Sequence, residues 1–84
     1  MNSAQVTEEP PMLAAGMRGW VRAWAEIARR YGQSDVDAPD PSSKECWQYM
    51  GSFDGVHQFR HRGLQGRRVY EDVAVADGDF EAAP

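Results

Sequence analysis

The sequence predicts a two-layer α+β fold, in which one long N-terminal helix lies across a three-stranded antiparallel meander in the order α-β-β-β. Two observations predict it. Apolar residues in the first third of the chain recur at intervals of four and three residues, the spacing of an amphipathic helix. Farther along, aromatic and β-branched residues alternate with polar ones between two glycine-containing turns, which is typical of short strands joined as hairpins.

The helix is predicted over residues 11–31. Pro11 fits the first helical position, and Gly32 fits a C-terminal cap. Arg29 and Arg30 lie in the last turn, where the helix dipole favours cations. The apolar stripe, which we expect to face the core, consists of Leu13, Met17, Trp20, Trp24, Ile27 and Tyr31.

Small residues line one side of this stripe. A glycine inside a helix costs about 1 kcal/mol relative to alanine, and Gly16 and Gly19 are two such positions. They are either tolerated or mark the close approach of another backbone, from the same chain or from a second copy. In the second case Gly16, Gly19 and Ala23 are candidate contacts of a homodimer. On the polar side we expect Glu26 to pair with Arg22, four residues earlier.

The chain is short, at 84 residues, so we predict a single domain over residues 10–76. Residues 1–9 are predicted to be flexible, and residues 77–84 to form an acidic C-terminal tail. Residues 33–43 are rich in proline, aspartate and serine and are predicted to form an acidic linker. A short helix with a capping box at Ser42 and Glu45 is the alternative there.

Strands are predicted at about residues 45–52, 56–62 and 67–76. The Asp54-Gly55 turn leaves two registers open, because a two-residue loop pairs Met50 with Phe59 and a three-residue loop pairs Tyr49 with Phe59. We favour the second register, since it separates apolar from polar residues. One face then holds Trp47, Tyr49 and Phe59, and the other holds Gln48, Gln58, Arg60 and Arg62. The register of the third strand stays open.

Metal-binding and catalytic patterns are weak. The soft metal ligands are Cys46, His57 and His61, which lack a fourth ligand and the usual spacing, so we expect two half-buried histidines and no metal or cofactor. No serine or cysteine lies in a nucleophile motif, and no glycine-rich phosphate loop is present. The sequence therefore predicts a protein without catalytic activity.

The charge is distributed in blocks. The net charge is −4, but residues 17–32 carry +3 and residues 57–70 carry +4. Four arginines surround the second turn, and arginine suits phosphate and carboxylate groups alike. The predicted binding residues are Arg60, Arg62, Arg67 and Arg68, assisted by Arg18, Arg22 and Arg29. Their anionic partner is an acidic protein surface or nucleic acid; internal pairing with the acidic residues of the chain is an equally weighted alternative.

These observations predict a small cytoplasmic accessory module that grips an anionic partner through an arginine-rich β-hairpin. No apolar run is long enough to span a membrane, and the single cysteine fits the cytosol. The alternatives are a structural homodimer without a separate ligand and an acidic inhibitor that mimics nucleic acid. The segment CWQYMGSFDGVHQFRHR with the later GRRVYEDV resembles small bacterial domains of unassigned role, and we attach no named family to it.

Overall fold

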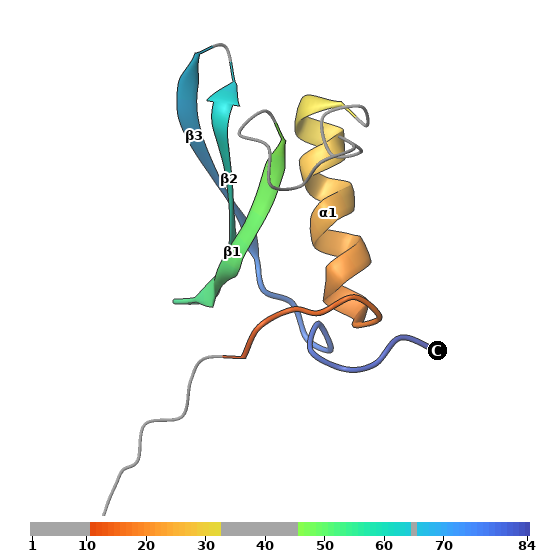
Figure 1. Ribbon diagram of the computed structural model, residues 1–84. Helices are drawn as coiled ribbons and strands as arrows, with labels where there is room; N and C mark the ends of the chain where they lie inside the picture. The colour runs from red at the N-terminus through yellow and green to blue at the C-terminus, as the bar shows by residue number, and fades with distance from the viewer. Residues whose placement is uncertain (1–10, 33–45, 65) are drawn as a thin grey trace, which may run out of the picture.

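The computed structural model describes residues 11–32, 46–64 and 66–84 and has the predicted α+β architecture. One helix, α1 (Arg18–Tyr31), packs on one face of an open antiparallel sheet (Figure 1). The sheet consists of β1 (Trp47–Phe53), β2 (Val56–Leu64) and β3 (Arg67–Ala74), with β2 in the centre. The predictions for residues 1–9 and 33–43, and for the capping box at Ser42 and Glu45, lie outside the described residues.

The helix begins seven residues later than predicted. Its first residue is Arg18 rather than Pro11, because Gly16 has φ +95° and Met17 is extended (φ −82°, ψ 152°), so a turn precedes the helix. Leu13 is nevertheless buried, which explains why the apolar spacing continues into a non-helical segment. The predicted end is correct: Gly32 has φ +108°, and its N–H donates to the carbonyl of Ala28 at 2.7 Å.

The predicted register of β1 and β2 is confirmed, with Tyr49 opposite Phe59. Its cause differs from the one we expected. The loop has two residues, Asp54 (φ 56°) and Gly55 (φ 79°), both left-handed as a type I′ turn requires. The shift by one residue arises in a β-bulge between Tyr49 and Gly51. The bulge therefore allows the two-residue turn and the pairing of Tyr49 with Phe59 to occur in the same hairpin.

The core lies between α1 and the sheet. Trp24 and Phe59 meet edge-on with ring centroids 4.8 Å apart, and Trp20 meets Tyr49 in the same way at 6.0 Å. Both helix tryptophans therefore pack on the aromatic face of the sheet, as predicted. The buried apolar residues of this core are Leu13, Ala23, Ile27, Trp47, Phe59 and Val73.

Two helix arginines bind the edge strand β3. Arg22 donates to the backbone carbonyl of Ala74 at 2.8 Å, and Arg30 donates to that of Asp72 at 3.0 Å. An edge strand with open backbone acceptors invites pairing with another chain. The guanidinium groups occupy two of these acceptors on β3.

The C-terminal segment, residues 75–84, folds back onto the start of α1 (Figure 1). The backbone N–H groups of Arg18 and Gly19 donate to the carbonyls of Glu81 and Asp79, each at 2.9 Å. The first N–H groups of a helix have no acceptor within the helix, and the C-terminal segment supplies carbonyl acceptors for two of them. The prediction of a tail over residues 77–84 is therefore wrong, because these residues cap the helix.

Candidate functional site

The sheet face opposite the helix carries three of the four hairpin arginines, Arg60, Arg62 and Arg68. His61 and Val69 are paired across β2 and β3, and both point to the helix side, where His61 is buried and Val69 packs on the core. Side chains alternate along a strand, so their neighbours point to the other face. We call this opposite surface the open face; its side chains include Gln48, Gln58, Arg60, Arg62, Arg68, Tyr70 and Asp72.

The four hairpin arginines differ in exposure. Arg60 is half-buried, and its Nε donates to the side-chain oxygen of Gln48 at 3.2 Å across the strands. Arg62, farther along β2, is half-buried as well. Arg67 and Arg68 are exposed at the start of β3, near the second turn. Arg67, two residues before Val69, points to the helix side, so the positive charge at this end of the open face comes from Arg60, Arg62 and Arg68.

The helix arginines predicted to assist them are placed elsewhere. Arg22 pairs with Asp79 at 2.5 Å rather than with Glu26, so the predicted i,i+4 pair is wrong. Glu26 instead binds Arg29 at 2.6 Å and Arg30 at 2.8 Å, and these two arginines lower its pKa to about 2. Arg18 is exposed at the start of α1, on the other layer. Helix and hairpin arginines therefore do not form one surface.

Two carboxylates that follow the hairpin arginines in sequence, Glu71 and Asp79, form ion pairs with arginines of the helix. Glu71 accepts from Arg30 at 2.7 Å and from the hydroxyl of Tyr31 at 2.5 Å, which raises the pKa of Tyr31. Asp79 binds Arg22. Within residues 11–32, 46–64 and 66–84, no carboxylate lies in ion-pair distance of Arg60, Arg67 or Arg68. Pairing with these acidic residues therefore does not neutralise those three arginines.

Tyr70 is an exposed aromatic residue in the middle of the open face; Phe53, 43% exposed, lies at its far end beside the first turn. Tyr70 lies directly opposite Arg60 on the neighbouring strand and is 49% exposed. Arg68, two residues earlier on β3, points to the same face. Among the described residues Tyr70 takes part in no ring–ring contact, whereas the rings on the helix side contact one another. Its ring is therefore available to a ligand.

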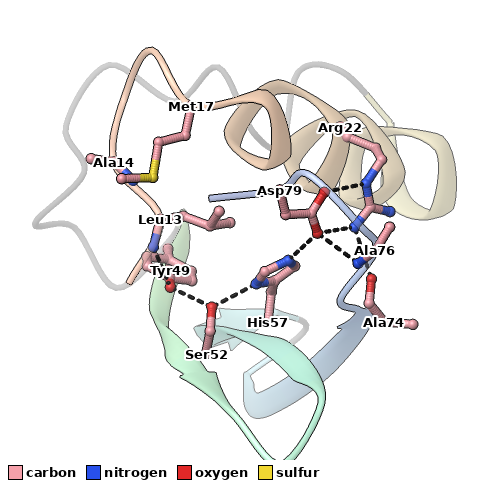
Figure 2. Close-up of polar contacts among 10 residues, drawn as sticks. All are labelled: Leu13, Ala14, Met17, Arg22, Tyr49, Ser52, His57, Ala74, Ala76 and Asp79. Carbon is pink, nitrogen blue, oxygen red and sulfur yellow. Dashed lines mark hydrogen bonds and ion pairs between the residues drawn. The ribbon is translucent and has the colours of Figure 1, made fainter. Parts of the chain in front are cut away.

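A second polar feature lies inside the molecule (Figure 2). Ser52 Oγ is 2.5 Å from Nδ1 of His57, and His57 Nε2 is 2.7 Å from Oδ2 of Asp79. The hydroxyl of Tyr49 extends the row, because it lies 2.6 Å from Ser52 Oγ and accepts the N–H of Leu13 at 2.8 Å. We call this row the polar chain; it consists of Tyr49, Ser52, His57, Asp79 and Arg22.

Asp79 is the acceptor on which the polar chain converges. It is 3% exposed and receives hydrogen bonds from Arg22, His57 and the N–H of Ala76. Arg22 is the main cause that holds the pKa of Asp79 well below its usual range, with the Ala76 N–H and His57 adding to it. An ionised carboxylate only accepts, so His57 Nε2 carries the proton. In the neutral ring, Nδ1 then accepts from Ser52, which in turn accepts from Tyr49.

The polar chain has the order of a Ser-His-Asp triad, but its surroundings differ from those of an exposed nucleophile. Ser52 is 4% exposed, and its oxygen lies between Tyr49 and His57. A mainly apolar pocket of about 370 Å³ touches it from one side, lined in part by Phe53, Val75 and Phe80. The chain joins β1, β2, α1 and the C-terminal segment, so we interpret it as a clasp that holds these parts together.

The three soft side chains, for which we expected no metal, are buried in the structure. His57 and His61 are buried rather than half-buried, at 0% and 4% exposure. His61 accepts the N–H of Gly63 through Nδ1 at 3.1 Å, and Cys46 is buried. In the described part of the chain, no group of three histidine, cysteine or acidic side chains is arranged to hold a metal ion.

Two of the three predicted dimer contacts, Gly19 and Ala23, are buried within the chain itself, whereas Gly16 is exposed. A Cβ on Gly19 would lie 2.6 Å from Cβ of Asp79, so the close approach we considered is real and comes from the C-terminal segment. Ala23 is fully buried, and Gly16 lies before the helix. These three residues therefore form no continuous exposed helix flank, and a homodimer stays a prediction.

Sequence reasoning missed Asp79 and Ser52, because their roles depend on contacts between distant segments. Two signals pointed toward them. Gly19 is unfavourable inside a helix unless another backbone approaches, and Phe80 is a large apolar residue in an acidic segment. Phe80 does pack against the core and lies edge-on to His57, with ring centroids 5.6 Å apart.

Comparison of the chain with protein-family models, with curated proteins and with solved structures gives no match. Among the described residues, the helix is too short and too polar to cross a bilayer.

Proposed function

We propose that this protein is a small non-catalytic binding module that grips an anionic partner with the arginine-rich end of the open face. The observation that carries the proposal is the division of charge between the two layers. Glu71 and Asp79 bind helix arginines, while Arg60 and Arg68 on the open face have no carboxylate partner in the described residues. Arginine binds phosphate and carboxylate groups through its planar fork, so these side chains suit an anion.

The acidic net charge of the whole chain does not oppose this proposal locally. The whole chain has a net charge of −4. Residues 1–10 and 33–45 together have a net charge of −5, so the described residues have a net charge of +1. On the open face, Asp72 lies opposite Gln58, two residue pairs farther from the second turn than the pair of Arg60 and Tyr70. Positive charge therefore dominates the end of this face near the second turn.

The test uses heparin as a generic polyanion and a charge-matched pair of double variants. Wild-type protein is expected to bind immobilised heparin at low salt and to elute as salt rises, because counterion release weakens such binding. The variant R60E/R68E is expected to lose retention. The control R18E/R29E changes the net charge equally, but on the helix, and is expected to elute close to the wild type.

Circular dichroism of each variant checks that it is folded. Failure of the wild type to bind heparin, or equal loss in both double variants, would refute a role for the open face. If R60E/R68E unfolds, R60Q/R68Q takes its place in the same comparison, since it removes the charge without introducing repulsion.

Acyl transfer by Ser52 is a second candidate, favoured by one observation: the row Ser52–His57–Asp79 with contacts of 2.5 and 2.7 Å beside an apolar pocket. It ranks second because Ser52 is nearly inaccessible. Intact-mass measurement after incubation with a fluorophosphonate decides it. An adduct on Ser52 that is absent from Ser52→Ala would support catalysis, and an unmodified wild-type protein would exclude a reactive serine.

A further inference from the structure

The open face carries an exposed aromatic side chain next to arginines. An anion that also contains a flat ring uses both kinds of side chain. Tyr70 is 49% exposed, lies opposite Arg60, and shares its face with Arg68. The remaining aromatic residues of the sheet, apart from Phe53 at the first turn, belong to the helix side. An exposed ring in the middle of a strand adds no packing to the core.

From this placement we propose that the open face binds single-stranded nucleic acid, with Tyr70 stacking on a base and Arg60 and Arg68 holding the adjoining phosphates. The inference rests on the proposed function, because it names the partner of the same surface. Unstacked bases offer π-faces to aromatic side chains on a sheet, and positively charged neighbours follow the backbone. An acidic polypeptide satisfies the arginines but makes no use of the ring.

The surroundings of Arg60 support this division of roles. Its Nε is held by Gln48 on β1, on the side away from Tyr70, which lies on β3. The guanidinium therefore contacts the first strand, and Tyr70 on the other neighbouring strand is 49% exposed. The fork of Arg60 retains donors beyond the one that Gln48 accepts, and these suit a phosphate.

Single strands fit this face better than a duplex. Arg60 and Tyr70 lie in a row across three strands, Gln48–Arg60–Tyr70, so they form part of a sheet surface rather than of a two-stranded ribbon. A two-stranded ribbon fits a major groove, whereas a sheet face presents side chains to bases that are already unstacked.

The test measures fluorescence anisotropy with three labelled probes of equal length: oligo-dT, an abasic oligomer with the same phosphates, and polyglutamate. Oligo-dT is expected to bind the wild-type protein most tightly. Tyr70→Ala is expected to weaken its binding about tenfold and to leave the abasic oligomer unaffected, because one stacked base is lost. Tyr70→Phe retains the ring and is expected to bind like the wild type.

The remaining outcomes separate this inference from the proposed function. Equal binding of oligo-dT and the abasic oligomer, or an unchanged affinity in Tyr70→Ala, would overturn the stacking role while heparin binding still stands. Tighter binding of polyglutamate than of oligo-dT would identify an acidic polypeptide instead and overturn the proposal. Absence of binding to all three probes and to heparin would refute both proposals.

Discussion

At the residue scale, the Asp79 side chain connects several parts of the described structure through hydrogen bonds. It receives hydrogen bonds from α1, from β2 and from its own turn, and it is almost completely buried. Removing this carboxylate leaves the buried His57 ring without an acceptor, which costs more than one hydrogen bond contributes. The aspartate therefore fixes three segments at one point.

Asp79→Ala is expected to lower the free energy of unfolding by about 3 kcal/mol, because it leaves the buried His57 Nε2–H and the Ala76 N–H unpaired. Urea unfolding followed by tryptophan fluorescence measures the change. Asp77→Ala is the matched control: Asp77 is exposed in the same turn, and its loss is expected to change stability by less than about 0.5 kcal/mol. Equal effects of the two variants would contradict the role of the polar chain.

At the element scale, the contact between α1 and the C-terminal segment explains the glycine inside the helix. The N–H of Gly19 donates to the carbonyl of Asp79 at 2.9 Å, so the two backbones are as close as neighbouring strands. An added Cβ at position 19 would lie 2.9 Å from that carbonyl oxygen. Glycine is required there by packing and not by its conformation.

Gly19→Ala is expected to destabilise the protein by about 1–3 kcal/mol through overpacking, although alanine favours the helix by about 1 kcal/mol. Ala25→Gly, at an exposed position of the same helix, calibrates that propensity and is expected to cost about 1 kcal/mol. Thermal unfolding by circular dichroism reports both. A Gly19→Ala variant more stable than the wild type would show that the C-terminal segment yields without cost.

Shortening the chain tests the same contact without adding atoms. Deleting residues 79–84 removes Asp79, removes Phe80 from the core, and leaves the N–H groups of Arg18 and Gly19 without their acceptors. We expect this variant to lose its cooperative urea transition. Deleting residue 84 alone keeps the bond from the Ala83 N–H to the Gly16 carbonyl and is expected to unfold like the wild type. Cooperative unfolding of the longer deletion would refute the capping role.

The elements differ in how far the sequence predicted them. Periodicity identified the helix and the pairing of Tyr49 with Phe59, because both depend on which residues face the core. It placed the helix start too early, since Leu13 and Met17 contact the core from an extended segment, and spacing does not distinguish that from another helical turn. The polar chain escaped prediction because it joins residues up to 57 positions apart.

At the scale of the whole molecule, the ion pairs of the described residues form on the helix side of the sheet. Helix arginines bind Glu26, Glu71 and Asp79, and three of the four hairpin arginines lie across the sheet from them. The same pairs attach α1 to β3 and to the C-terminal segment. Charge thus both stabilises the fold and leaves one face positive, so protonation of the carboxylates weakens the fold without removing the arginines.

The stability of the whole molecule is therefore expected to depend on pH in the acid range. The pKa of Asp79 is lower in the folded state than its unfolded value near 3.9, so its contribution is fully present above that value and is lost as pH falls toward the folded pKa. Glu26, with a pKa of about 2, changes in the same direction. We expect the urea midpoint of the wild-type protein to be level from pH 5 to 7 and to decrease below about pH 4.5.

The variant Asp79→Asn tests this assignment. Its urea midpoint is expected to be lower than that of the wild type at pH 7, to fall less steeply with pH and to approach the wild type near pH 2, whereas Asp77→Asn should follow the wild-type curve. A wild-type midpoint that rises on acidification, or an Asp79→Asn curve parallel to the wild type, would show that the buried carboxylate does not control the acid stability of this fold.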